Sequence, residues 1–331
     1  MRRRDFLSVL GGTAVAWPLA ASAQQTDRTR RIGVLMPLSA TDSEGQAEVG
    51  AFVDQLQKQG WTVGGNLSID YRWAAGDKER MDAFATELIA LQPDVIFTRS
   101  TPATASLLKQ TRTIPVVFTV VSDPVGEGLV ASLARPGGNA TGFTNAESSL
   151  TGKWLGLLKE VIPSASRIGF MFDPKTAPGG GHYYTQLIET AAPSFAVLPT
   201  AMPVHIPADI ENAIEQFARQ PNGGLLVLPD ATTNLHRQLI ITLAARYRVP
   251  AVYAFRYLAA DGGLMSYGVN VVELFRNAAN YVDRILKGTK PAELPIQLPE
   301  KFEFVINLKT AKTLGLTIPP GVFAIADEVI E

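Results

Sequence analysis

The stretch RRIGVLMP, residues Arg30–Pro37, shows the pattern on which the whole chain is built. Its short, continuous apolar run is typical of a strand that is buried on both faces of a parallel sheet. The segment Ser43–Gly60 has apolar residues at helical spacing and stops at a glycine, so the two together predict a β-α unit. The pattern begins again at residues 166–174, SRIGFMFDP. This repeat predicts two α/β lobes of similar construction.

Strands and helices alternate in both halves of the chain. This order predicts doubly wound parallel sheets, because parallel neighbours need a crossover that is usually a helix. The fold class is therefore α/β, with two doubly wound parallel-sheet lobes joined by a hinge. In the first half we expect further strands at 67–72, 93–97 and 114–118 and helices at 81–91 and 103–110. In the second half we expect strands at 196–201, 225–228 and 251–254 and helices at 210–219, 235–247 and 271–287.

The lobes are expected to be joined at two connectors, 141–146 and 262–270, whose glycines and small polar residues can absorb hinge rotation. Beyond the second lobe, 303–307 predicts a strand and 308–314 a helix. The expected parts are an N-terminal lobe of 30–144 plus about 266–289, a C-terminal lobe of 145–265, and a tail of 290–331 whose lobe the sequence leaves open.

The N-terminus, MRRRDFLSVLGGTAVAWPLAASAQQ, differs from the rest of the chain. An arginine-rich start, an apolar run and the small residues Ala21–Ala23 predict a cleaved, twin-arginine-like export signal in residues 1–23. An uncleaved anchor is disfavoured because the apolar run is shorter than the roughly 20 residues that a spanning helix needs. The chain has no cysteine, so neither a disulfide nor a lipidated cysteine can form. We therefore expect a periplasmic protein that is soluble after signal cleavage.

Composition and motifs exclude several function classes. The 331 residues are 46% hydrophobic and carry a net charge of −1, which is typical of a globular protein and gives no basic field for nucleic acid. The histidines, His182, His205 and His236, have no metal-binding spacing. The chain also lacks a Walker loop, a nucleophile elbow and a dinucleotide fingerprint. We therefore expect no metal, no cofactor and no catalytic residue.

Polar residues follow the expected strands of the first lobe, at the edge where open parallel sheets bind ligands. Ser122 and Asp123 follow one strand and are held by a proline. Ser100 and Thr101 follow the preceding strand, with Thr101 as the expected N-cap of a helix whose amino end favours an anion. The loop 37–41 can close the site. This arrangement suits a ligand with an amine and a carboxylate, such as an amino acid, although Asp123 could instead cap a turn.

The second lobe has aromatic residues and an aspartate at the corresponding strand ends. Phe172, Tyr253 and Phe255 could stack on an aromatic ligand, and Asp230 could take part in polar recognition. The alternative is that Tyr253 and Phe255 fill the core and that Asp230 caps a helix. The expected ligand-binding residues of both lobes are Leu38, Ser39, Ser100, Thr101, Ser122, Asp123, Phe172, Asp230, Tyr253 and Phe255.

Four sequence blocks stand out beyond the strand pattern. They are DPVG at 123–126 followed by GLV at 128–130, SLARPGGN at 132–139, GGLMSYG at 262–268 and VINLKTAK at 305–312. Together they resemble the ABC-transporter substrate-binding proteins of the tryptophan/tyrosine-binding type. The resemblance implies the type I periplasmic-binding-protein fold, with two lobes, a hinge and a ligand in the cleft. Ser100, Thr101 and Asp123 match the family's cleft motif, whereas the anchoring cysteine of some members is absent.

These features predict the periplasmic solute-binding component of an ABC uptake transporter. We expect a monomer that binds a small molecule, such as an amino acid and including aromatic ones, and delivers it to an inner-membrane permease. Two alternatives stay open. One is an exported α/β enzyme that uses Asp123 and Asp230 as acid and base. The other is a periplasmic sensor module that passes its closed state to a signalling partner.

Overall fold

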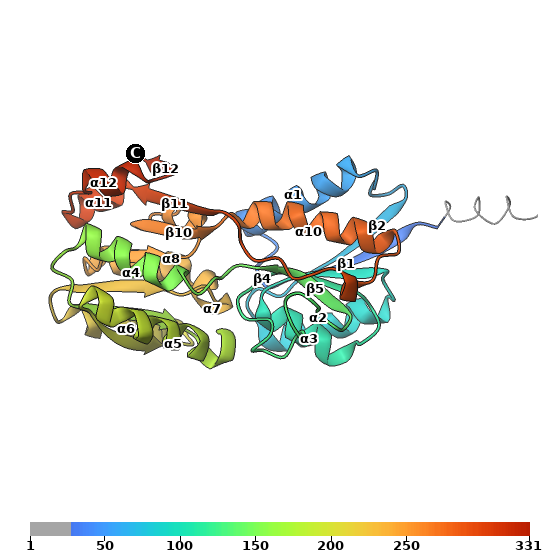
Figure 1. The fold of residues 1–331 in the computed structure, drawn as a ribbon, viewed down its shortest axis with the longest axis horizontal. Helices are drawn as coiled ribbons and strands as arrows, with labels where there is room; N and C mark the ends of the chain where they lie inside the picture. Colours follow the sequence, from blue (N-terminus) through green and yellow to red (C-terminus); the bar gives the residue numbers. More distant parts are fainter. Residues whose placement is uncertain (1–27) are drawn as a thin grey trace, which may run out of the picture.

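The computed structural model describes residues 28–331, in which two α/β lobes lie side by side (Figure 1). The expected export signal, residues 1–23, lies outside the described residues. None of the helices in the described part of the chain is long and apolar enough to cross a membrane. The two-lobed α/β fold expected from the repeat is confirmed.

The first lobe is a five-stranded parallel sheet in the order β2-β1-β3-β4-β5. Helices α1 and α10 cover one face and α2 and α3 cover the other (Figure 1). The strands are β1 Arg30–Met36, β2 Leu67–Trp73, β3 Val95–Arg99, β4 Val116–Val121 and β5 Ala140–Thr144. The helices are α1 Ser43–Lys58, α2 Lys78–Ala90, α3 Thr101–Gln110 and α10 Val271–Leu286.

The second lobe is a seven-stranded sheet in the order β12-β11-β10-β9-β8-β6-β7. Its strands are β6 Arg167–Phe172, β7 Leu198–Pro203, β8 Gly223–Val227, β9 Ala251–Tyr253, β10 Met265–Val269, β11 Phe302–Asn307 and β12 Glu328–Ile330. Its helices are α4 Leu150–Val161, α5 His182–Ala191, α6 Pro207–Ala218, α7 Ala231–Leu235, α8 Arg237–Arg246, α9 Arg256–Ala260, α11 Leu308–Leu314 and α12 Pro320–Ala324. The expected helix 235–247 corresponds to α8, and the short helix α7 precedes it.

One strand pair in the second sheet differs from the all-parallel expectation. Strands β10 and β11 are antiparallel, whereas the other pairs of this sheet are parallel. The cause is the path of the chain. It leaves the second lobe at the end of β10, forms α10 in the first lobe, and returns into β11 from the interlobe side. A strand that starts where its neighbour ends must run in the opposite direction.

The chain crosses between the lobes three times in the described residues, at 145–149, at Asn270 and at 298–301. The first two crossings lie at the ends of the expected connectors, because β5 occupies most of 141–146 and β10 most of 262–270. β10 pairs with β9, so α10 is the part of 266–289 that packs on the first lobe. The third crossing divides the tail, because Gln297 hydrogen-bonds to β5 and β11 joins the second sheet.

Aromatic packing fixes the end of β3 at the border between the lobes. Phe52 of α1 stacks on Phe97 of β3, with ring centres 4.3 Å apart, and Phe275 of α10 meets Phe97 edge-on at 4.9 Å. All five residues of β3 are buried. The three elements therefore hold Arg99, the last residue of β3, in a fixed position beside the second lobe.

Candidate functional site

A small cavity lies where the strand ends of the two lobes meet. It measures about 20 Å³, which is room for about one water molecule. An organic ligand therefore requires the lobes to be further apart than they are here. The first lobe contributes Arg99, Ser100, Thr101, Pro102, Val120 and Ser122, and the second contributes Thr176, Pro178, Pro229, Asp230, Ala231 and Asn234.

Ser100 joins β3 to α3 in a backbone conformation that is unusual for a residue with a side chain. Its φ of 80° and ψ of 154° lie in a region populated mainly by glycine, which costs about 1–3 kcal/mol. Ser100 is the N-cap of α3, one residue before the expected Thr101. Its hydroxyl is buried and has no hydrogen-bond partner among the described residues. The strain therefore places an unpaired hydroxyl at the cavity wall, beside the amino end of a helix.

Strand β4 ends with a second strained residue. Val120 has a φ of 56°, an outlier for a β-branched side chain, and the pairing of β4 with β5 shifts register there. Two residues later, the Ser122 hydroxyl accepts a hydrogen bond from Tyr184 Oη of the second lobe at 3.0 Å and donates one to Asn145 at 3.1 Å. Burial raises the pKa of Tyr184, so its hydroxyl keeps its proton and stays a donor. The end of β4 thus forms a direct bond between the lobes.

Arg99 and Glu48 form an ion pair that is sealed from solvent beside the cavity. Arg99 Nε lies 3.1 Å from Glu48 Oε2, and the two side chains are 1% and 0% exposed. The pair is poorly aligned, because Arg99 Nε and both Glu48 oxygens lack a hydrogen-bond partner within residues 28–331. Burial raises the pKa of Glu48 to about 7, against the attraction of Arg99. The guanidinium also reaches the second lobe, where Nη2 donates to Tyr257 Oη at 3.5 Å.

Asp230 lines the cavity from the second lobe and also caps α7. Its carboxylate accepts hydrogen bonds from the Thr233 amide at 2.8 Å, the Asp173 amide at 3.0 Å and the Thr176 hydroxyl at 3.2 Å. Burial raises the pKa of Asp230 to about 7, although these bonds favour the charged form. Three of about four acceptor positions on the carboxylate are thus occupied by the protein. Asp230 therefore caps a helix, as the alternative interpretation of the sequence predicted.

The structure brings four of the predicted residues, Ser100, Thr101, Ser122 and Asp230, to this cavity. Asp123 does not line it. Its Oδ1 accepts a hydrogen bond from the Gly126 amide at 2.8 Å, which is the turn cap that the sequence left as an alternative. The enzyme hypothesis paired Asp123 with Asp230, but only Asp230 lines the cavity.

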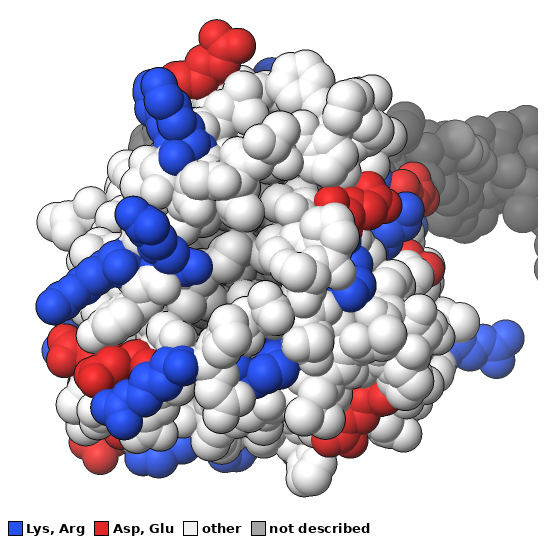
Figure 2. Space-filling model, turned by 90° about the vertical axis from the view of Figure 1, so that its left-hand side faces the viewer, with Lys and Arg blue, Asp and Glu red and all other residues white. Residues whose placement is uncertain are grey.

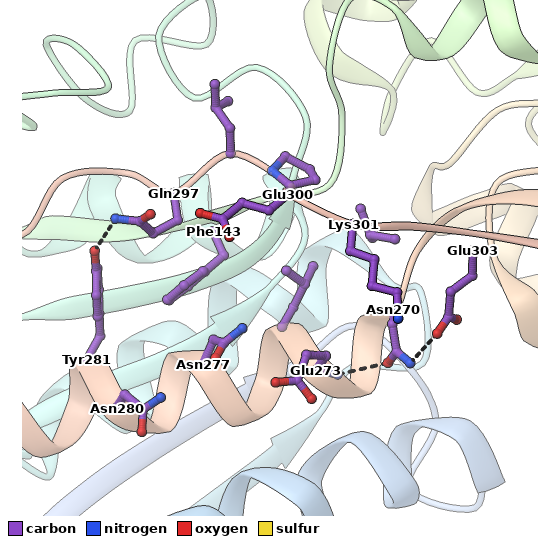
Figure 3. Close-up of a pocket in the computed structure, with 14 residues that line it drawn as sticks. Phe143, Asn270, Glu273, Asn277, Asn280, Tyr281, Gln297, Glu300, Lys301 and Glu303 are labelled. Atoms are coloured by element: carbon purple, nitrogen blue, oxygen red, sulfur yellow. Dashed lines mark hydrogen bonds between the residues drawn. The ribbon is translucent and has the colours of Figure 1, made fainter.

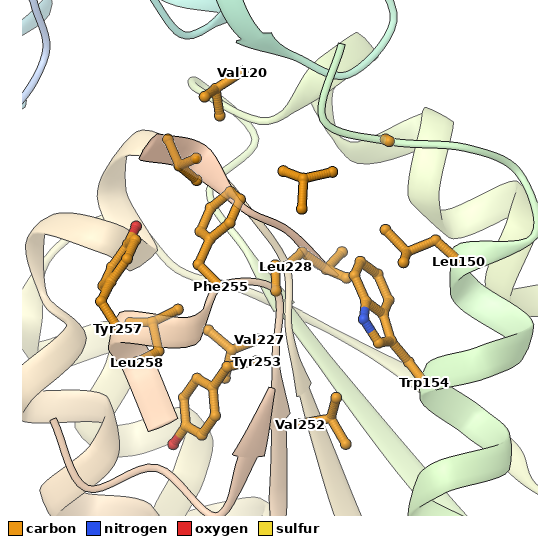
Figure 4. Close-up of a cluster of buried hydrophobic side chains, with 14 of the residues drawn as sticks. Val120, Leu150, Trp154, Val227, Leu228, Val252, Tyr253, Phe255, Tyr257 and Leu258 are labelled. Atoms are coloured by element: carbon orange, nitrogen blue, oxygen red, sulfur yellow. The ribbon is translucent and has the colours of Figure 1, made fainter. Parts of the chain in front are cut away.

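The other predicted residues lie outside the cavity wall. Leu38 is buried and Ser39 bonds to Thr41 within the loop after β1. Phe172 packs against Phe170 in the second-lobe core. Tyr253 and Phe255 are each 1% exposed and belong to the apolar cluster around Trp154, in which Phe255 lies across from Val120 (Figure 4). In this arrangement the aromatic side chains fill the core rather than line the cavity.

Several lining residues were not predicted, and Arg99 is the most informative. A signal for it existed in the sequence. Arg99 ends the buried strand VIFTR, and Glu48 shares the buried face of α1 with Val49 and Phe52. Each charge lies on a surface that must be buried, which indicates that each needs a partner but not which residue supplies it. Asn234 gave no such signal, because its position depends on the fold of the second lobe.

A larger groove of about 620 Å³ lies between α10 and the connector 297–303 (Figure 3). Tyr281 Oη accepts a hydrogen bond from Gln297 at 2.8 Å, and Asn270 donates to Glu303 at 2.8 Å (Figure 3). These hydrogen bonds join α10 to a segment that crosses between the lobes. The shape of the groove therefore depends on how far the lobes are rotated about the hinge. None of the predicted ligand-binding residues lines it.

Comparison with known proteins agrees with this architecture. The family model described as ABC transporter substrate binding protein matches residues 31–330. The chain belongs to this family. Substrate-binding proteins of ABC transporters bind small molecules and typically work outside the cytoplasm. The resemblance seen in the four sequence blocks is therefore confirmed.

Individual relatives share about a quarter of their residues with this substrate-binding protein. A tyrosine-binding protein of Clostridioides difficile is 25% identical over 268 residues, which cover 80% of this chain and 75% of the relative. A conserved domain protein from Vibrio cholerae has a TM-score of 0.85 at 28% identity, covering 91% of this chain and 100% of that one. An ABC domain from Streptococcus pneumonia in complex with L-Trp has a TM-score of 0.84 at 24% identity, with the same coverage.

Proposed function

We propose that this substrate-binding protein works in the periplasm as a monomer, closes on a small molecule such as an amino acid, and delivers it unchanged to an inner-membrane ABC permease. The observation that carries the proposal is the convergence of strand ends from both lobes on one buried polar cavity. Strained residues and buried polar atoms without partners gather there, as expected of a binding site. The tyrosine and tryptophan named for two relatives make aromatic amino acids the first compounds to test.

Contacts between the lobes support a closing mechanism. Besides the bond from Tyr184 to Ser122, Arg237 of α8 pairs with Asp42, the N-cap of α1, at 2.8 Å. The Glu127 carboxylate accepts a hydrogen bond from the Gly179 amide across the same interface. These contacts must break when the lobes separate, because each joins one lobe to the other. They therefore stabilise the closed arrangement, and a ligand in the cleft adds to them.

The molecular surface suits a protein that meets a partner transiently. Figure 2 shows the end of the second lobe, where Lys and Arg lie in separate groups with Asp and Glu between them. This face has no continuous basic field of the kind that binds nucleic acid. Docking to a permease through such a face would depend on local charge pairs and on the distance between the lobes.

Calorimetry with a broad panel of amino acids, organic acids and sugars tests the function. We expect at least one compound class to bind with a micromolar Kd, about −8 kcal/mol, and to reduce the radius of gyration measured by X-ray scattering. The bound compound should be recovered unchanged, which separates a receptor from the exported enzyme. Stimulation of ATP hydrolysis by the reconstituted permease separates it from a sensor. A folded protein that binds nothing in the panel would contradict the proposal.

A further inference from the structure

Arg99 supplies the positive charge of the cavity wall. The lining contains two charged side chains, Arg99 and Asp230. The Asp230 carboxylate already accepts three hydrogen bonds from the protein. Arg99 differs, because its recorded contacts are the ion pair of Nε with Glu48 at 3.1 Å and one long hydrogen bond from Nη2 to Tyr257 at 3.5 Å. A guanidinium has five N–H donors, so Arg99 has donor capacity that the protein does not use.

The position of Arg99 is fixed by groups on both lobes. Glu48 holds Nε from the α1 side at 3.1 Å. Tyr257 accepts from Nη2 at 3.5 Å, and the ring centre of Phe255 lies 6.0 Å from the guanidinium carbon. Tyr257 is itself held by a hydrogen bond to Asn234 at 2.8 Å. The charge is therefore preorganised at the border of the lobes instead of being mobile in solvent.

Two further features beside Arg99 favour an anion. The Ser100 hydroxyl is 7% exposed, lines the cavity and has no hydrogen-bond partner within residues 28–331. The first turn of α3 begins at Thr101, and the Thr101 and Ala103 amides have no acceptor inside the helix, whereas Pro102 has no N–H. The helix dipole adds partial positive charge at the same place. A guanidinium, a hydroxyl and a helix amino end thus meet in one corner of the cavity.

Among the described residues, the wall of this cavity has no carboxylate that is free to bind an amine. Asp123 lies off the cavity and caps its turn, and Asp230 is engaged by the protein. Glu48 is 0% exposed behind Arg99 and does not line the cavity. The wall therefore has an anion-binding end, and it has no site for an ammonium group at the other end.

We propose that Arg99, positioned by Glu48 and assisted by Ser100 and the amino end of α3, binds the carboxylate of the ligand, so that this protein selects small organic acids and does not require an amine. The proposal rests on the proposed solute-receptor function and narrows its substrate class. The main specificity contact is then on the first lobe, at a residue that is not among the predicted ligand-binding residues. An amino acid binds through its carboxylate alone.

Matched sets of probes test the proposal. Indole-3-propionate, L-tryptophan and tryptamine share a ring and differ in their charged groups, as do 3-phenylpropionate, L-phenylalanine and phenethylamine. Calorimetry with the full mature chain should show that the acid of a set binds, that the amino acid binds no more tightly than the acid, and that the amine does not bind. Binding of an amine as tightly as the corresponding acid overturns the proposal.

Variants of Arg99 connect the selectivity to this residue. Arg99→Gln should weaken binding of the acid about 10–100-fold, the value of a charge-assisted hydrogen bond, and Arg99→Lys should recover part of the loss. If Arg99→Gln folds poorly because Glu48 is left unpaired, the double variant Glu48→Gln/Arg99→Met removes both charges and should bind the acid as weakly. Asp123→Asn is the matched control, and it should leave the affinity unchanged.

The outcomes separate this proposal from the general function. If the acid binds but the Arg99 variants bind it equally well, the carboxylate site is wrong and the solute receptor stands. If the wild type binds none of the probes, this proposal fails, whereas the receptor function is decided by the broader panel. Loss of acid binding in the Arg99 variants, with binding retained in Asp123→Asn, supports both.

Discussion

Replacing Glu48 with glutamine should stabilise this protein at pH 8 and leave its stability almost unchanged at pH 4. Glu48 is 0% exposed, and burial raises its pKa from 4.5 to about 7 in spite of the neighbouring Arg99. The folded protein therefore stabilises the neutral acid form of Glu48 more than the anion. Glutamine has nearly the same shape as the neutral acid, so the substitution removes the ionisation and keeps the packing.

Proton linkage gives the sign and size of the change in the free energy of unfolding with pH. Below pH 4.5 the carboxyl is protonated in both the folded and the unfolded chain, and its contribution to stability is fully present. Between pH 4.5 and about 7 the unfolded chain loses a proton that the folded chain keeps, so the free energy of unfolding falls as pH rises. Above about pH 7 the loss is complete and amounts to about 3 kcal/mol. Asp230 acts in the same direction, because burial raises its pKa to about 7 as well.

Urea denaturation from pH 4 to pH 9 measures the effect. We expect the wild type to lose stability across this range, and Glu48→Gln to lose less of it, with the remaining slope due to Asp230. At pH 8 the variant should be more stable than the wild type by up to about 3 kcal/mol. Glu160→Gln, at an exposed position, is the control and should follow the wild-type curve.

The opposite result, a Glu48→Gln variant that is less stable than the wild type at pH 8, would have a different physical cause. If the attraction between Glu48 and Arg99 exceeds the cost of burying the two charges, Glu48→Gln leaves Arg99 as an uncompensated cation. Breaking a buried pair of that kind costs about 3–5 kcal/mol. A Glu48→Gln variant that is destabilised by this amount at pH 8 would therefore contradict the prediction.

Three further substitutions test the strain and the contacts between the lobes. Ser100→Gly should raise the free energy of unfolding by about 1 kcal/mol, because glycine adopts a φ of 80° without steric cost; a fall in the denaturation midpoint would contradict this. Tyr184→Phe removes the hydrogen bond to Ser122, and it should lower stability by about 1 kcal/mol and increase the radius of gyration of the ligand-free protein in X-ray scattering. Unchanged scattering would show that this bond does not hold the lobes together. Arg237→Gln breaks the ion pair with Asp42, so the wild type should open further in 1 M salt than at low salt, whereas the variant should respond little. An equal response of both proteins to salt would assign closure to other contacts.

The candidate site shows why strand ends are difficult to read from sequence. The apolar pattern predicts that one strand ends near Phe118, but β4 continues to Val121 through the strained Val120. Side chains alternate between the faces of a strand, so a shift of one residue decides which of Ser122 and Asp123 meets the second lobe. In the structure Ser122 lines the cavity and Asp123 caps a turn. The proline after Asp123 indicates a corner but not which side chain is used.

The sequence alone predicts the α/β class, the two lobes and most of the parallel strands, because each buried strand and each amphipathic helix is a local pattern of apolar residues. It also determined the family, through blocks that span the chain. The third crossing, the antiparallel β11 and the pairing of Glu48 with Arg99 become visible only in the folded chain. These features join residues that are distant in the chain, and their energies come from burial and charge in three dimensions, which no local pattern contains.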